Sequence, residues 1–314
     1  MNVFLWHVHG SWTTAFVHGP HTYLVPVLPS RGPDGRGRAT TYEWPASAVE
    51  VTPADAARAD VDVVILQRPE ELNGLAEAWL GGHRPGRDLP AVYLEHNAPQ
   101  GRINEMRHPA ADRDDLLLVH VTEFNRLFWD CGATRTAVIE HGIVDPGERY
   151  SGELERAAVC INEPQRRGRV VGADLLPVFE RALPCDVFGI GTANNLPQRR
   201  LHQEMARRRV YLHPYRWTSL GLSLLEAMQL GMPVAALATT SAAEAVPAEA
   251  GIVCNRLETL VEGLAWLRRD PGAARRMGPA ARAAALERFG LERFLRDWDA
   301  LLQEVRGSRR VVAA

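Results

Sequence analysis

Residues 217–237 read Trp217-Thr218-Ser219-Leu220-Gly221-Leu222-Ser223-Leu224-Leu225-Glu226-Ala227-Met228-Gln229-Leu230-Gly231-Met232-Pro233-Val234-Ala235-Ala236-Leu237. Leucine and methionine recur at helical spacing from Leu224 to Met228. Gly231 ends this helix, and Pro233 prevents its continuation. The apolar run at 234–237 then predicts a short buried strand. The stretch is therefore a helix–strand unit of an α/β protein.

The start of the predicted helix is suited to an anion. Thr218 and Ser219 are candidate N-caps, and Gly221 allows the backbone to approach another group closely. The free N–H groups and the dipole of a helix N-terminus favour phosphate. Glu226 is the only acid on this helix. Spacing alone equally allows an ordinary helix–strand unit with a surface glutamate.

A family resemblance rests on this stretch together with two later positions. Residues 221–228, 231–234, Glu244 and 251–253 resemble the nucleotide-sugar signature of GT-B glycosyltransferases, most similar to the retaining GT4 family. The family pattern has two glutamates eight residues apart. The second implies that Glu226 holds the ribose of the nucleotide. The first falls on Thr218, which either alters the choice of sugar or serves only as an N-cap.

The resemblance also implies how the diphosphate is held. The backbone N–H groups of Gly221, Leu222 and Ser223 would donate to it, with Thr218 and Ser219 beside them. The family places a basic residue and then Lys-Gly after the first strand of the second domain; here Arg167 and Gly168 stand at the Lys-Gly positions. Arginine can replace lysine because it binds phosphate bidentately.

The earlier basic position of this family motif has no clear match. Arg166 and Arg169 are candidates for it, and a solvated basic turn is the alternative for the whole run. Arg167 would be catalytic, because it would neutralise the charge that grows on the leaving group. The Gly-x-Gly that ends at Gly191 resembles the loop bordering the base pocket, and it fails as a dinucleotide fingerprint.

Loops after two strands of the first half carry further candidates. The segment 3–8 is predicted as the first strand, and in the resembling family the loop after it touches donor and acceptor through Gly10 and Ser11. His7 and His9 alternate, which would place both on one face, but no third metal ligand is evident. His96 follows the strand at 91–94, and the resemblance implies a catalytic contact with the transferred sugar. A loop histidine capping a carbonyl is the alternative.

The chain as a whole alternates strands and helices, and the resemblance implies the GT-B fold: two Rossmann-like α/β domains with parallel sheets facing across a cleft. We predict an N-terminal, acceptor-side domain at 1–145 and a C-terminal, donor-side domain at 150–290, with a linker at about 143–155. Residues 291–314 would form a helix that packs back on the first domain, with a loose tail from 309. Residues 16–28 are predicted as a hairpin-like strand pair.

Composition restricts the class of protein. The chain has 314 residues, 46% hydrophobic and 24% charged, with a net charge of −2, which gives no support for nucleic-acid binding. All 36 cationic residues are arginine. Four scattered cysteines fit a reducing compartment, and neither a signal peptide nor a membrane span is evident, so a cytoplasmic protein is expected. Oligomeric state and peripheral membrane contact stay open.

These observations predict a metal-independent glycosyltransferase that moves a sugar from a nucleotide-sugar to an acceptor hydroxyl, with retention and without a bound cofactor. The base, the sugar and the acceptor stay undefined. One alternative is a GT-B sugar-nucleotide epimerase using Glu95, His96 and His213. The other is a binding protein without turnover, which the missing first glutamate at Thr218 keeps open.

Overall fold

The structure is a computed structural model and describes residues 1–312. Its backbone contacts divide the chain into two compact units. Unit 1 comprises Met1–Gly142 and the chain from Leu291 onward, and unit 2 comprises Ile143–Gly290. No helix within the described residues has both the length and the apolar character needed to cross a membrane.

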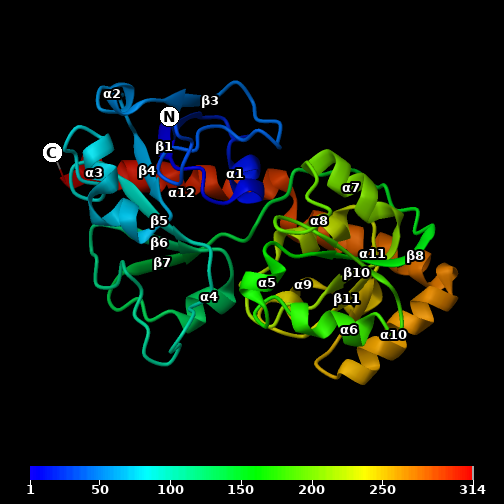
Figure 1. Ribbon diagram of the computed structural model, residues 1–314. Coiled ribbons are helices and arrows are strands. Elements are labelled where there is room, and N and C mark those ends of the chain that lie inside the picture. Colours follow the sequence, from blue (N-terminus) through cyan, green and yellow to red (C-terminus); the bar gives the residue numbers. More distant parts are fainter. Residues whose placement is uncertain (313–314) are drawn as a thin grey trace. The chain divides into compact units, whose positions relative to one another are not determined.

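Unit 1 is built on a sheet of seven strands in the order β3-β2-β1-β4-β5-β6-β7 (Figure 1). All neighbouring strands are parallel. The central strands are buried on both faces, as parallel strands covered by helices are. The strands are β1 (Asn2–Leu5), β2 (Thr22–Pro26), β3 (Ala48–Val51), β4 (Val63–Leu66), β5 (Ala91–Glu95), β6 (Leu117–His120) and β7 (Arg135–Val138).

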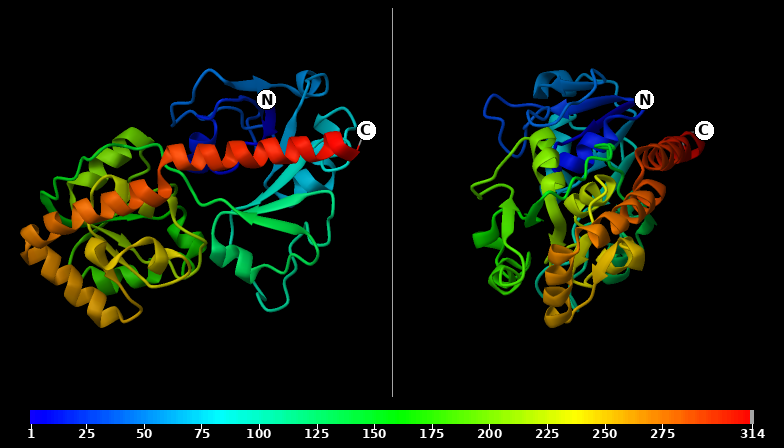
Figure 2. Two further views of the ribbon diagram at one scale, coloured as in Figure 1. Left: turned by 180° about the vertical axis from the view of Figure 1, so that it is seen from behind. Right: turned by 90° about the vertical axis from the view of Figure 1, so that its right-hand side faces the viewer.

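The helices of unit 1 are mostly short. They are α1 (Gly10–Phe16), α2 (Pro53–Ala56), the π-helix η1 (Glu71–Leu75), α3 (Ala76–Trp79), α4 (Glu123–Phe128) and α12 (Leu291–Val312). The long helix α12 returns to this unit and runs beside α1 (Figure 2). Trp298 on α12 packs edge-on against Trp12 and Phe16 of α1, with ring centroids 5.6 and 5.1 Å away. All three rings are buried, so α12 completes this core.

Unit 2 contains a parallel five-stranded sheet in the order β12-β11-β10-β8-β9. Its strands are β8 (Leu154–Cys160), β9 (Cys185–Phe188), β10 (Arg208–His213), β11 (Val234–Ala236) and β12 (Gly251–Val253). Its helices are α5 (Pro164–Arg167), η2 (Ala173–Leu175), α6 (Leu176–Phe179), α7 (Gln198–Arg207), α8 (Leu222–Gln229), α9 (Ala242–Ala245), η3 (Ala248–Ala250), α10 (Leu257–Arg269) and α11 (Pro271–Phe289).

Alternate residues of β8 face two separate hydrophobic clusters. Ala158 and Cys160 belong to one, and Ala157 and Val159 to the other. The sheet is thus covered on both faces, in agreement with the predicted α/β class. The predicted two parallel-sheet units are confirmed.

Several predicted elements are wrong. The hairpin-like pair at 16–28 does not form: α1 ends at Phe16, and β2 pairs in parallel with β1 and β3. The loop expected at 7–12 contains the start of α1, and β1 ends at Leu5, so His7 and His9 are not on a strand. The tail expected to be loose from 309 is helical through Val312, and residues 313–314 lie outside the described part.

Each sheet has one point where the chain order changes direction. In unit 1 the chain runs from β1 through β2 to β3 and then resumes at β4, on the other side of β1. In unit 2 it runs from β8 to β9 and resumes at β10, on the other side of β8. Open α/β sheets bind ligands outside the carboxyl ends of the strands at such points. The loops after β1, β4, β8 and β10 are therefore the places to look for function.

Candidate functional site

The first candidate region is the start of α8, which follows β10 in unit 2. Gly221 is the N-cap, and no side chain caps the helix. Leu224 N–H is the first to bond back, to Gly221 O at 3.0 Å. Within the described residues, the N–H groups of Gly221, Leu222 and Ser223 have no acceptor. Three backbone donors are thus available at a helix N-terminus.

The structure corrects the N-cap prediction for Thr218 and Ser219. Because α8 begins at Leu222, both residues precede the cap. Thr218 is partly exposed, and Ser219 is buried, with its carbonyl accepting from Ser241 N–H at 3.4 Å. The reading of Thr218 as only an N-cap is therefore wrong. Its contact with a sugar stays a prediction.

Gly221 is required by a close neighbour and not by its backbone angles, since its φ is −71°. A Cβ at this position would lie 2.5 Å from Cε1 of His213 and 3.2 Å from its Nε2. The His213 ring stacks on Tyr215 with centroids 4.5 Å apart, and burial lowers its pKa to about 3. A neutral imidazole thus supports the loop before α8.

Glu226 lies on α8 and is buried, which excludes the surface glutamate of the simple helix–strand reading. Its two carboxylate oxygens have neighbours on α7. Gln198 Nε2 donates to Oε1 at 3.3 Å, and His202 Nε2 lies 3.3 Å from Oε2. A carboxylate has about four acceptor positions, and the contact of Glu226 with ribose hydroxyls stays a prediction.

The three candidate arginines after β8 differ in their partners. Arg166 bonds to Glu163, and Arg169 forms an ion pair with Asp174 at 3.2 Å. Arg167 forms no ion pair with any residue of the described chain. Its guanidinium lies 5.7 Å from the centroid of the Tyr215 ring. Burial raises the pKa of Tyr215 to about 12, and the nearby Arg167 opposes this rise.

These partners matter because a guanidinium already paired with a carboxylate has less to offer an incoming anion. Arg167 is the one of the three whose charge is not neutralised within residues 1–312. Gly191 follows β9 on the same edge, is exposed and has a φ of +78°. The loops after β8 and β9 meet here, since Glu163 N–H donates to Ile190 O at 2.6 Å.

The second candidate region lies at the carboxyl edge of unit 1. Gly10 and Ser11 open α1 and both face Tyr42: a Cβ on Gly10 would lie 2.9 Å from Tyr42 Cε2, and Ser11 Oγ is 3.2 Å from Tyr42 Oη. His7 and His9 have different neighbours. His7 Nδ1 lies 3.0 Å from Gly37 O, whereas the His9 ring lies 4.0 Å from that of His96.

His96 follows β5 and belongs to a cluster of histidines with the partly buried His9 and the buried His141. Its Nε2 lies 2.9 Å from Gln67 Oε1, so it does not cap a carbonyl through that nitrogen. Burial, with smaller contributions from His9 and His141, holds the pKa of His96 well below its usual value. Burial also lowers the pKa of His9 to about 4 and that of His141 to about 3. The cluster is neutral at physiological pH.

Sequence reasoning missed Gln67, His9 as a partner of His96, and Tyr215. Gln67 was detectable, because it is a polar residue directly after a buried strand, as His96 is. The epimerase alternative draws on Glu95, whose carboxylate is already engaged. It accepts from Asn97 N–H at 2.6 Å and lies 3.0 Å from His108 Nε2. Glu95 is thus part of the buried framework.

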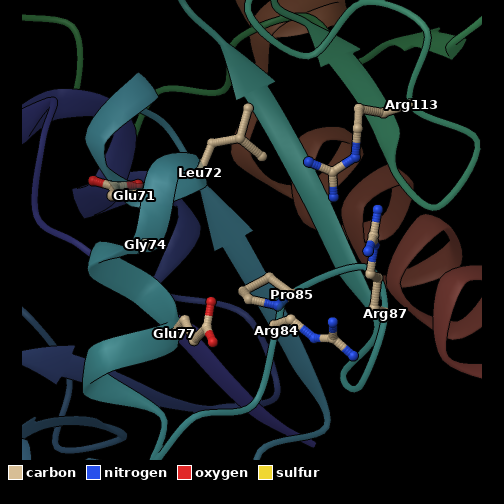
Figure 3. Close-up of a pocket in the computed structure, with 8 residues that line it drawn as sticks. All are labelled: Glu71, Leu72, Gly74, Glu77, Arg84, Pro85, Arg87 and Arg113. Atoms are coloured by element: carbon tan, nitrogen blue, oxygen red, sulfur yellow. The ribbon is translucent and has the colours of Figure 1, made fainter.

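A separate pocket of about 150 Å³ lies in unit 1, lined by none of the predicted site residues (Figure 3). Its arginines are paired: Arg84 with Asp88, and Arg87 and Arg113 with Asp115. Its cationic groups are therefore committed to internal ion pairs. We therefore do not regard this pocket as a candidate functional site.

Comparisons with known proteins agree with this geometry. Residues 189–284, which contain Gly191 and the whole of α8, match the family model described as "Glycosyl transferases group 1". Among solved structures, HepE from Anabaena in complex with UDP-glucose is 15% identical with a TM-score of 0.70, and covers 97% of this chain and 100% of its own.

Two further solved structures have the same fold. Sucrose-phosphate synthase from Thermosynechococcus elongatus is 13% identical over 98% of this chain and 100% of its own, with a TM-score of 0.69. TarM from S. aureus is 12% identical over 76% and 55%, with a TM-score of 0.60. No curated protein matches the chain. The chain thus has the fold of these solved glycosyltransferase structures, and its residues 189–284 match a group 1 glycosyltransferase domain.

Proposed function

We propose that the chain transfers a sugar from a nucleoside diphosphate sugar to an acceptor hydroxyl with retention of configuration. The observation that carries this proposal is the set of donors at the carboxyl edge of unit 2. Three N–H groups without acceptors, from Gly221 to Ser223, begin α8 on one side of the switch point, and the unpaired Arg167 follows β8 on the other. Glu226 supplies a buried carboxylate further along α8.

The proposed step is a substitution at the anomeric carbon. The bond from that carbon to the diphosphate oxygen breaks, and a bond to the acceptor oxygen forms. The proton of the acceptor hydroxyl passes to the departing diphosphate, so the protein need not supply a base. Negative charge grows on the diphosphate, and oriented N–H groups with Arg167 stabilise it without reorganisation. No metal ion or other cofactor is part of the proposal.

Uridine diphosphate is the nucleotide to test first, because HepE was solved with UDP and UDP-glucose. Glu226 would accept from the ribose hydroxyls. Hydrogen bonds to a charged group contribute about 1.5–3 kcal/mol each. Glu226→Ala should therefore weaken UDP binding about tenfold or more.

Calorimetry on the folded variant measures this effect, with Glu258→Ala as the matched control, because Glu258 is exposed and lies on α10, outside the signature residues. Equal UDP affinity in wild type and Glu226→Ala would reject the ribose role. Assays of glucose transfer from UDP-glucose to trial acceptors, including water, then distinguish an enzyme from a protein that only binds the donor. If the wild type neither binds nor uses any nucleotide sugar in a UDP, GDP, ADP and dTDP series, the proposed function is rejected.

A further inference from the structure

Tyr215 connects three segments at the carboxyl edge of unit 2. It lies two residues after the end of β10 and is 8% exposed. Its Oη donates to the backbone carbonyl of Cys160, the last residue of β8, at 3.0 Å. Its own carbonyl accepts from Oγ1 of Thr239, in the loop after β11, at 2.6 Å. The backbone and the hydroxyl of Tyr215 are thus both held, so the sheet determines where its ring lies.

Two groups stack on the Tyr215 ring. The His213 ring lies nearly parallel to it, at 13° and a centroid distance of 4.5 Å. The guanidinium of Arg167 lies over the ring, 5.7 Å from its centroid. His213 in turn borders the N-cap of α8, since a Cβ on Gly221 would lie 2.5 Å from its Cε1. The rings of Tyr215 and His213 therefore connect Arg167 to the backbone donors at the start of α8.

Arg167 differs from its neighbours in the kind of partner that holds it. Arg166 and Arg169 are exposed and contact carboxylates, whereas Arg167 is half-buried and contacts an aromatic ring. A cation within about 6 Å of a ring centroid is attracted by the ring quadrupole. The ring has no net charge, so it holds the guanidinium without neutralising it. The charge of Arg167 stays available for an anion.

The backbone around Arg167 does little to hold this side chain. Arg167 is the last residue of α5, a helix of four residues, and Gly168 follows it with a φ of +44°. A helix of this length has little stability of its own. A long side chain on such a segment loses rotamer freedom when it binds an anion. A contact that orders the side chain beforehand reduces that cost.

We propose that Tyr215 is a positioning residue that holds the Arg167 guanidinium by cation–π stacking, so that its charge is placed for the diphosphate of the donor before the donor binds. This inference rests on the proposed function for its ligand. Tyr215 does not bind the diphosphate itself and acts only through Arg167. Its contribution to binding should therefore disappear when Arg167 is removed.

The contact can be measured by NMR of the full chain without any ligand. Protons over an aromatic ring are shielded by the ring current, and an Arg167→Lys variant assigns the Nε–H signal of Arg167. This signal should move downfield in Tyr215→Leu, and it should stay near its wild-type position in Tyr215→Phe, which keeps a ring. The control is Trp266→Leu, which removes an exposed ring of α10 and should leave the signal unchanged. An unchanged signal in Tyr215→Leu would overturn the contact.

A double-mutant cycle on UDP affinity tests the role of the contact. Tyr215→Leu should weaken UDP binding about fivefold, and Tyr215→Phe should retain most of the wild-type affinity. Arg167→Ala should weaken UDP binding about tenfold or more. Adding Tyr215→Leu to Arg167→Ala should then cause no further loss, because residues that act as one unit are not additive. Calorimetry on the four proteins gives the cycle.

The cycle separates positioning from a general structural role. Additive losses in the double variant would overturn the inference, as would wild-type UDP affinity in Tyr215→Leu. If Tyr215→Leu does not fold, Tyr215→Phe decides: a loss of UDP affinity as large as that of Arg167→Ala, or a downfield Nε–H signal, would contradict a role for the ring. Failure of the wild type to bind any nucleoside diphosphate would count against the proposed function, whereas the NMR signal decides the contact by itself.

Discussion

The carboxyl edges of the two sheets present different chemistry on a similar topology. In unit 1 the loops after β1, β4, β5 and β7 bring together buried side chains that are neutral, including His96 and Gln67. In unit 2 the loops after β8 and β10 present the charge of Arg167 and backbone N–H groups at Gly221–Ser223. One edge is thus suited to hydroxyl groups and the other to an anion. Parallel sheets provide the location, and the loop residues decide the ligand.

The largest expected difference between the two units is the effect of acid on their stability. Burial is the main cause that lowers the pKa of six histidines in unit 1 and of one, His213, in unit 2. The six are His7, His9, His21, His96, His120 and His141. An unfolded histidine has a pKa of about 6.5. Below that pH the unfolded chain binds more protons than the folded one, so the free energy of unfolding decreases as the pH is lowered.

The fall continues until the pH passes the folded values, which are about 4 for His9 and about 3 for His141 and His213. Between pH 6.5 and pH 4.5 we expect unit 1 to lose hydrogen-exchange protection before unit 2. Peptide-resolved exchange, corrected for the intrinsic effect of pH, measures this order. Earlier loss of protection in unit 2 would contradict the difference between the two edges.

The next effect concerns the anion edge of unit 2. Arg167→Ala should lower kcat by about a hundredfold or more, because removing one donor to a developing oxyanion typically costs 10²–10³. Arg169→Ala is the matched control, since that guanidinium is exposed and paired with Asp174. Its kcat should change little. Steady-state transfer assays on both variants test the assignment, and a larger loss in Arg169→Ala would move the role to that residue.

A smaller effect tests how rigidly this edge is held. Gly221→Ala should destabilise the protein by about 1–3 kcal/mol, because the new methyl group would collide with the His213 ring. Gly307→Ala is the control: a Cβ there meets nothing within 4 Å, and alanine in a helix is favourable by up to about 1 kcal/mol. Urea unfolding of both variants gives the comparison. If Gly221→Ala were as stable as wild type, the His213 ring would move aside at no cost.

Much of the fold could be predicted from sequence because its signals are local. The buried strands β4, β5 and β6 are uninterrupted apolar runs, and Gly231 and Pro233 mark the end of α8. Helix α1 was missed because its seven residues are stabilised by α12, nearly 300 residues later. A contact between residues so far apart in sequence produces no recognisable hydrophobic periodicity in a helix of seven residues.

From the sequence, candidate site residues could be identified only by their residue type and their position in a motif. Glu226, Arg167 and His96 were identified in this way, although their roles stay predictions. The N-cap at Thr218 was wrong because the hydroxyl residues precede the real cap, Gly221, by two or three positions. The pairing of Arg166 and Arg169 with acids, and the link from Gln67 to His96, depend on which loops the sheet brings together.

The central claim is that the backbone N–H groups at the start of α8 hold the diphosphate of the donor. Hydrogen exchange at Gly221, Leu222 and Ser223, followed with and without saturating UDP, tests it directly. We predict that UDP slows exchange of these three amides, with the largest change at this position of unit 2. Binding of UDP that leaves these amides unchanged, or that protects the carboxyl edge of unit 1 instead, would contradict the account.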